Sequence, residues 1–265
     1  MSWAEQGAPL VYAGVLWFVA TGAVLALDSR GRGNFAVALT ATGALACLAL
    51  VIVAATVGNA SPLAAYTAFT AALLIWGWHE LAFLTGAAAG PNRSPLPAGA
   101  RGWTRFRLSA ATVIHHEIAL MLTALLLTGL CWRAANPVAA QTFALLFAMR
   151  LSTKLNIFAG VPHFDIAMLP PHLAYLASHF RVRPAGLPML LSLAALLGGA
   201  IFLGERALAA SGGAAVGGSL VFALVALGVL EHLFLVLPTR DAALWRWANR
   251  HQNTNNRFRT TGAAE

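Results

Sequence analysis

Seven apolar segments, with nearly all of the positive charge on one side of them, constrain the fold of this chain more than any other feature. A transmembrane helix needs about 20 mostly apolar residues to cross the ~30 Å hydrocarbon core of a bilayer. Backbone polar groups in lipid must be bonded internally, so runs of this length are typical of helices. The sequence therefore predicts an all-α, polytopic integral membrane bundle of about seven transmembrane helices. Their expected spans are about 9–27, 34–57, 62–84, 108–132, 137–158, 185–204 and 214–237.

We expect residues 1–240 to form this single transmembrane domain and residues 241–265 to form a cytoplasmic tail. Between the fifth and sixth spans, Pro171 suits a first helical turn, and Leu173, Leu176 and Phe180 recur at helical spacing. This pattern predicts a short amphipathic surface helix over about 171–180.

The basic residues mark one side of the predicted bundle. If the N-terminus lies outside the cell, 15 of the 17 Lys and Arg residues fall on the inner side, and only Arg133 and Arg206 fall outside. Because loops rich in Lys and Arg stay in the cytoplasm, the C-terminus is expected inside. The Arg residues are spread over short loops, so no nucleic-acid partner is expected, whereas membrane lipids with anionic headgroups are.

Ionisable residues also lie within or beside the apolar segments, where charge is costly and usually paired or functional. Four of the nine acidic residues lie there, and each has a histidine within two positions. We expect these groups, with a basic pair one helical turn apart in the span 137–158, to meet in one polar layer toward the cytoplasmic face. Its candidate members are His79, Glu80, His115, His116, Glu117, Arg150, Lys154, Glu231 and His232. Second-tier candidates are His163, Asp165, His172 and His179, the last two on one wet face of the surface helix.

Two of the roles open to this layer follow from its charges. The two cations favour a structural or proton-relay network of ion pairs and hydrogen bonds. Carboxylates and neutral imidazoles from different helices can instead hold a metal ion, with iron as a candidate. Neighbours on a helix point about 100° apart, so residues 115–117 cannot all face one ion. The candidate metal ligands are Glu80, His116, Glu117, Glu231 and His232.

A third role is contact with a pigment or haem, because neutral imidazole is a common ligand of the metal ion at the centre of these macrocycles. Ala111 lies four positions before His115, and Gly228 lies four positions before His232. A small residue at this spacing leaves room for a macrocycle beside the helix, so bacteriochlorophyll is a second candidate cofactor.

Several runs of residues resemble a known family. Together they are similar to the PuhE family of photosynthetic complex assembly proteins in anoxygenic phototrophic bacteria, and the resemblance extends from the third span to the tail. The runs are Trp76–Gly86 (WGWHELAFLTG), His116–Leu120 (HEIAL), Ser152–Pro162 (STKLNIFAGVP), Leu169–Leu176 (LPPHLAYL), Leu230–Pro238 (LEHLFLVLP) and Asp241–Trp247 (DAALWRW).

The resemblance implies an assembly factor for the reaction centre and core antenna, coupled to bacteriochlorophyll supply, in the bacterial inner (cytoplasmic or intracytoplasmic) membrane. Its implied partners are reaction-centre or light-harvesting subunits, or enzymes of bacteriochlorophyll biosynthesis. No catalytic residue comes with the resemblance, so a role other than an enzyme is expected. The alternative is a metal-dependent, di-iron-like membrane oxidoreductase that acts on a pigment, quinone or lipid through the polar layer. A proton-coupled transporter is less favoured, because the ionisable groups are expected at one depth.

Overall fold

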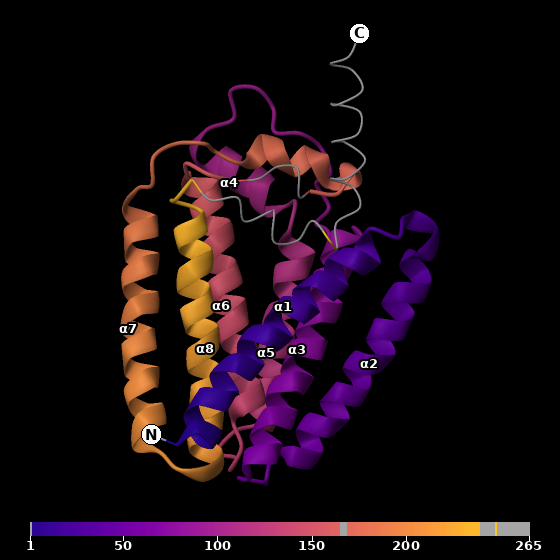
Figure 1. Cartoon of the computed structure of the whole chain (residues 1–265). Coiled ribbons are helices and arrows are strands. Elements are labelled where there is room, and N and C mark those ends of the chain that lie inside the picture. Colours follow the sequence, from indigo (N-terminus) through magenta and orange to yellow (C-terminus); the bar gives the residue numbers. More distant parts are fainter. Residues whose placement is uncertain (1, 165–168, 239–246, 248–265) are drawn as a thin grey trace, which may run out of the picture.

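A computed structural model of the chain describes residues 2–164, 169–238 and 247. Figure 1 shows long helices side by side, with shorter segments gathered across one end. Among the described residues the regular elements are all helical, apart from one isolated bridge between Val161 and Val182. The prediction of an all-α bundle is confirmed.

Most helices begin and end within three residues of the expected bounds; the exceptions are the helix expected over 185–204, which ends at residue 209, and the span expected over 108–132, which is broken. Prolines stand in the first turns of several, where a missing N–H removes no helical bond. The α-helices are α1 (Ala8–Asp28), α2 (Phe35–Thr56), α3 (Pro62–Leu84), α4 (Gly102–Ala110), α5 (Ile114–Leu130), α6 (Val138–Ala159), α7 (Leu187–Ala209) and α8 (Gly212–Phe234). Shorter elements are a π-helix, η1 (Trp3–Gly7), and two 3-10 helices, η2 (Arg32–Asn34) and η4 (Pro171–His179).

The structure has fewer candidate membrane spans than the seven that the sequence predicts, when helices are judged by their length and composition. Among the described residues, five segments are long and apolar enough to cross a membrane: 3–28, 32–56, 62–84, 187–209 and 212–234. The bent pair of α4 and α5 makes a sixth if it counts as one span. The chain is therefore a multi-pass helical protein with five or six candidate spans, while the seventh span, through α6, and the orientation stay predictions.

Helices α3 and α8 form the centre of the bundle. Helix α3 contacts α1, α2, α5, α6 and α8, and 56% of its apolar window is buried, as in α8. Only 6% of the corresponding window of α7 is buried, and α7 packs mainly on α8. Small residues allow the close approach: a Cβ at Gly217 would lie 2.5 Å from a methyl group of Val138, and one at Gly213 would lie 2.0 Å from the Ala60 carbonyl oxygen.

The predicted fourth span, 108–132, is not one continuous helix. It breaks at residues 111–113, and α4 turns away from α5 by 67°. N–H groups of the loop after α3 donate to carbonyls at the break, which can then no longer accept the bonds of a continuous helix. Gly90 N–H donates to the Thr112 carbonyl (2.8 Å) and Asn92 N–H donates to the Ala111 carbonyl (3.1 Å). These carbonyls would otherwise accept from N–H groups four residues later.

The predicted amphipathic α-helix over 171–180 is instead the 3-10 helix η4. Its buried residues Leu173, Leu176 and His179 follow one another at intervals of three, which matches three residues per turn. His172 and His179 therefore do not share a face, and His179 is only 3% exposed. The prediction of one wet face that carries both histidines is wrong.

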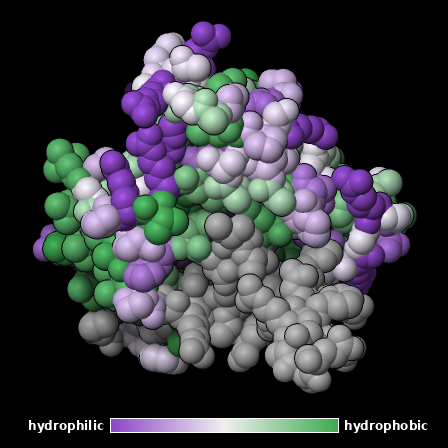
Figure 2. Space-filling model, turned by 90° about the horizontal axis from the view of Figure 1, so that it is seen from above, coloured by the Kyte–Doolittle hydropathy of each residue, from purple (hydrophilic) through white to green (hydrophobic). Residues whose placement is uncertain are grey.

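The described connections at one end of the bundle hold six arginines, whereas those at the other end hold Arg133. The described connections 29–34, 85–101, 160–164 and 169–186 lie at the end where α4 and η4 pack (Figure 1). Seen from above, this end gathers hydrophilic residues, with hydrophobic residues at its left margin (Figure 2). Trp247 lies against α1, with its ring centroid 6.1 Å from that of Phe18. Asp165 and the rest of the tail, Trp245 included, fall outside the described residues.

Candidate functional site

Two ion pairs join α6 to its neighbours at the loop-rich end. Arg150 Nη2 donates to Glu80 Oε2 of α3 at 2.9 Å, and Lys154 Nζ donates to Glu117 Oε1 of α5. Arg150 and Lys154 are four residues apart, so they lie on one face of α6. The side chains of Glu80, Glu117 and Lys154 are mostly buried, while that of Arg150 is 38% exposed. Mostly buried charges need such partners, because an unpaired ion in a low-dielectric interior is costly. With His116, which lies between them, these four residues form the charged cluster.

His116 occupies the centre of the charged cluster. The residue is 0% exposed, and its ring centroid lies 4.8 Å from that of Phe83. Its Nε2 lies 3.7 Å from Glu80 Oε1, which is longer than a hydrogen bond. Neither ring nitrogen has a hydrogen-bond partner in the structure as described, and the same holds for Glu80 Oε1, Glu117 Oε2 and Arg150 Nε. Most buried polar atoms in proteins are bonded, so the cluster has unused bonding capacity.

A second polar cluster lies on the opposite face of α6, without carboxylates or ammonium groups. Ser152 Oγ lies 2.9 Å from His232 Nε2 of α8 and 3.0 Å from Ser192 Oγ of α7. Asn156 Nδ2 donates to Ser192 Oγ at 2.8 Å, and Nδ1–H of His232 donates to the Gly228 carbonyl at 2.8 Å. These four side chains form the neutral cluster, which ties α6, α7 and α8 together.

The other residues predicted for the polar layer lie apart from the charged cluster. His79 is buried, and its Nε2 lies 3.0 Å from Thr123 Oγ1 of α5. His115 is exposed, and its Nδ1 lies 2.9 Å from the Ala89 carbonyl. Glu231 is half-buried and has neither a hydrogen bond nor an ion pair within the described part of the chain. The structure thus brings five of the nine predicted residues together, places His232 in the neutral cluster, and leaves three outside both.

The second-tier histidines bond to the backbone of the loop-rich end. His172 Nε2–H donates to the Leu84 carbonyl at 2.7 Å, at the end of α3. The Nε2 of His179 lies 3.2 Å from the Ser94 carbonyl oxygen, and its Nδ1 lies 3.0 Å from the side-chain Oγ of Ser109. The backbone N–H of His163 donates to the Leu235 carbonyl at 3.2 Å. These contacts hold the connections against the helix ends.

Arg105 is a residue that sequence reasoning missed. It is 4% exposed, and its Nη2 donates to the carbonyls of Phe158 (2.9 Å) and His179 (2.8 Å), so it links α4, α6 and η4. Its guanidinium also lies 3.8 Å from the centre of the Phe158 ring, within the range of a cation–π contact. In the same region, burial raises the pKa of the Tyr175 hydroxyl, and Arg93 partly offsets that rise.

The metal-ligand set suggested by the sequence is not assembled. Within residues 2–164 and 169–238, no three His, Cys, Asp or Glu side chains come together in a way that could hold a metal ion. Arg150 and Lys154 occupy one oxygen of Glu80 and of Glu117, and His232 faces α6 from the other side. One oxygen of each of these two carboxylates is thus used in an ion pair.

Comparison with known proteins identifies a family whose description names no function. A family model described as "Protein of unknown function (DUF3623)" matches residues 3–256. The chain is 39% identical over 237 residues to a Rhodobacter capsulatus protein described as "Uncharacterized 30.4 kDa protein in puhA 5'region", and the match covers 88% of this chain and 86% of that one. No solved structure matches.

Proposed function

The chain belongs to the DUF3623 family, and from this membership and the gene neighbourhood of its relative we propose that it is a membrane assembly factor for the bacterial photosynthetic reaction centre and core antenna. The observation that carries the proposal is the position of the relative's gene beside puhA, in a photosynthesis gene region. The similar runs in the sequence, including Trp76–Gly86 and Leu230–Pro238, point to the PuhE family and to the same role.

The arrangement of the helices supports a protein that binds partners in the bilayer. Only Met189 and Ala207 of α7 are buried, and the helix packs mainly on α8. Gly198 and Gly199 lie on α7 with no atom within 4 Å of a Cβ built at either position, whereas Gly217 and Gly218 of α8 are already in close contact within the bundle. Small residues allow close contact between membrane helices, so α7 is the surface on which we expect a partner helix to pack.

An affinity purification tests the proposal. The full chain, tagged at its N-terminus and expressed in a phototrophic host, is extracted in mild detergent and its partners are quantified by mass spectrometry. We expect enrichment of reaction-centre or antenna subunits, or of pigment-biosynthesis enzymes, over a tagged, unrelated multi-pass protein. Recovery of none of these classes contradicts the proposal.

Two substitutions locate the surface. Gly199→Leu should reduce the recovery of partners, because a large side chain holds a neighbouring helix away. Gly129→Leu is the matched control, since Gly129 lies on α5 and also has open space around it. Equal loss in both variants argues against α7 as the specific contact surface.

A further inference from the structure

Adjacent histidines at the start of α5 face opposite environments. His116 points into the charged cluster, while His115 is exposed. The Nδ1 atom of His115 lies 2.9 Å from the Ala89 carbonyl oxygen. A carbonyl can only accept, so Nδ1 carries the proton in this contact. The neutral ring therefore has its lone pair on Nε2, which has no hydrogen-bond partner among the described residues.

The Ala89 carbonyl is held in place by the bend between α4 and α5. Gly90 and Asn92 donate their N–H groups to the carbonyls of Thr112 and Ala111, and Asn92 Nδ2 donates to the Leu108 carbonyl at 3.0 Å. A Cβ at Gly90 would lie 1.9 Å from the Ala111 carbonyl oxygen, so only glycine allows this approach. The tautomer and direction of the His115 ring thus depend on a well-bonded loop rather than on the ring alone.

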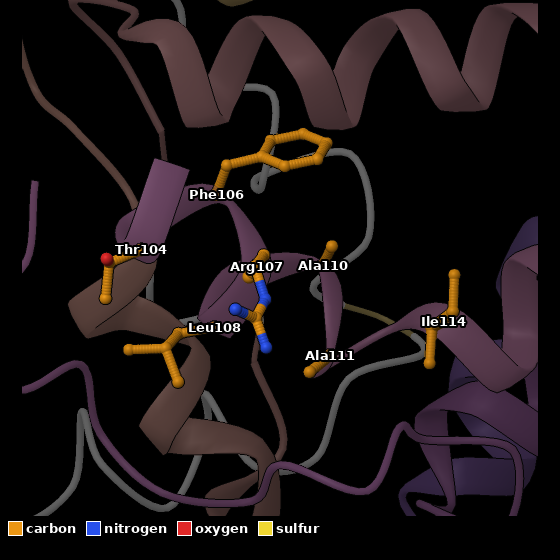
Figure 3. Close-up of a pocket in the computed structure, with 7 residues that line it drawn as sticks. All are labelled: Thr104, Phe106, Arg107, Leu108, Ala110, Ala111 and Ile114. Atoms are coloured by element: carbon orange, nitrogen blue, oxygen red, sulfur yellow. The ribbon is translucent and has the colours of Figure 1, made fainter. Parts of the chain in front are cut away.

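A cavity of about 480 Å³ lies in the same bend. This volume is within the range of small-molecule sites. Figure 3 shows Phe106 and Arg107 of α4 on one side and Ile114 of α5 on the other, with Ala110 and Ala111 between them. His115 is not one of the lining residues, but it follows Ile114 directly, so the imidazole and the cavity both lie at the start of α5. The lining is apolar except for Arg107 and Thr104.

An apolar track leads away from His115 along α5. Ile118, Leu122 and Leu125 are 43%, 57% and 61% exposed, and they follow His115 by 3, 7 and 10 residues, which places all four on one helix face. A hydrocarbon tail could lie along this face, while a flat polar ring occupies the bend and Arg107 meets its carbonyl or carboxylate groups.

The ligand class follows from the number of protein ligands. A free divalent ion needs several ligands, and no group of three candidate side chains exists in the described ranges. A metal already held in a macrocycle needs only one axial imidazole. Such a histidine normally donates its other N–H to a carbonyl or carboxylate, as His115 does to Ala89.

We propose that His115 is the axial ligand of a magnesium tetrapyrrole with a hydrocarbon tail, whose ring lies against the bend between α4 and α5. The choice of a magnesium pigment over a haem rests on the proposed function, whereas the single-imidazole site rests on the structure. Gly90 is a positioning residue that acts through the Ala89 carbonyl.

A titration with purified full-length protein tests the site. The probe is bacteriochlorophyll a in detergent, and the control ligand is bacteriopheophytin a, which has the same ring and tail but no metal. We expect wild-type protein to bind the pigment and to shift its absorption to that of a form with one axial nitrogen ligand. His115→Leu should weaken binding on the order of 100-fold, and Gly90→Ala about 10-fold, the usual range for a lost second-shell contact.

Controls separate ligation from adhesion to an apolar surface. His172→Leu removes another imidazole that is bonded to a carbonyl and should bind the pigment as wild type does. His115→Gly should recover the absorption shift when free imidazole is added. Because His115 is exposed, its variants should elute from size exclusion as wild type does.

Three results overturn the site: no binding to wild type, equal binding of bacteriopheophytin a, or equal affinity of His115→Leu. The assay uses no cellular partner. Its failure therefore counts against the pigment site alone, and failure of the affinity purification counts against the assembly role alone.

Discussion

The charged cluster and the neutral cluster lie on opposite faces of the same helix. Arg150 and Lys154 face α3 and α5, whereas Ser152 and Asn156 face α7 and α8. Both pairs use a spacing of four residues, and the two-residue offset between them turns one pair about 200° from the other. Helix α6 is therefore polar on two faces, which explains why it is the least apolar of the long helices.

The two clusters differ in how completely they are bonded. Ser152, Asn156, Ser192 and His232 each have at least one side-chain hydrogen bond. The charged cluster has two ion pairs but leaves five buried polar atoms without partners, two of them on His116. A fully bonded network fixes helix positions. A partly bonded one keeps donors and acceptors that can bind something else, such as a proton or a polar group. We infer that the neutral cluster stabilises the bundle and that the charged cluster is the more adaptable of the two.

The largest expected effect comes from removing one charge of an ion pair. Glu80→Ala leaves Arg150 without its carboxylate and should reduce the free energy of unfolding by up to about 3–5 kcal/mol, the cost when the remaining charge is fully buried; the Arg150 side chain is 38% exposed. The measurement is unfolding in detergent micelles, together with the steady-state level of the protein in the membrane. Glu205→Ala is the matched control, because Glu205 is exposed near the far end of α7. Equal stability of the two variants would show that Arg150 does not depend on Glu80.

A smaller loss is expected in the neutral cluster. Asn156→Ala removes the amide that bonds Ser192 Oγ and should reduce the free energy of unfolding by about 1–3 kcal/mol, the cost of leaving a buried polar group unbonded. The control is Thr67→Ala, since Thr67 is only half-buried and its hydroxyl bonds the Leu63 carbonyl one turn earlier. A loss from Asn156→Ala as large as that from Glu80→Ala would remove the distinction between the clusters.

Much of the fold is predictable from the sequence, because helix positions follow from runs of apolar residues. The helix ends at residues 62, 84 and 138 agree with the expected spans to within a residue. The break between α4 and α5 is not predictable in this way. It arises when the loop at Gly90 and Asn92 takes two helical carbonyls, which is a tertiary effect with no proline or glycine at the break itself.

Part of the candidate site is also predictable. Charge in an apolar segment is rare enough to identify Glu80, Glu117, Arg150 and Lys154 from sequence, and opposite charges in low dielectric attract one another. Serine and asparagine are weaker signals, so the neutral cluster was missed. The spacing of Ser152 and Asn156, four residues apart within an apolar run, is the pattern that could have revealed it.

The second ion pair allows a direct measurement of coupling. In a double-mutant cycle of Glu117→Gln and Lys154→Met, we expect a coupling energy between about 0.5 and 3 kcal/mol, because the two side chains are bonded to each other and mostly buried. A cycle of Asn156→Ala with Lys154→Met should give a coupling near zero, since those residues face opposite sides of α6. Coupling of similar size in both cycles would mean that the two faces respond as one unit.

The smallest change in the free energy of unfolding is expected when Glu231 is neutralised. This change tests whether Arg150 pairs with Glu80 alone or also with Glu231. Glu231 has no ion pair or hydrogen bond in the part of the chain that the structure describes, while Glu80 accepts a 2.9 Å bond from Arg150. Glu231→Gln should therefore change the free energy of unfolding by about 0.5 kcal/mol or less. The comparison is Glu80→Gln, which keeps the shape of the side chain and removes the charge from the bonded partner. If both variants lose the same stability, the Arg150 guanidinium is shared between the two carboxylates, and the charged cluster extends from α3 across to α8.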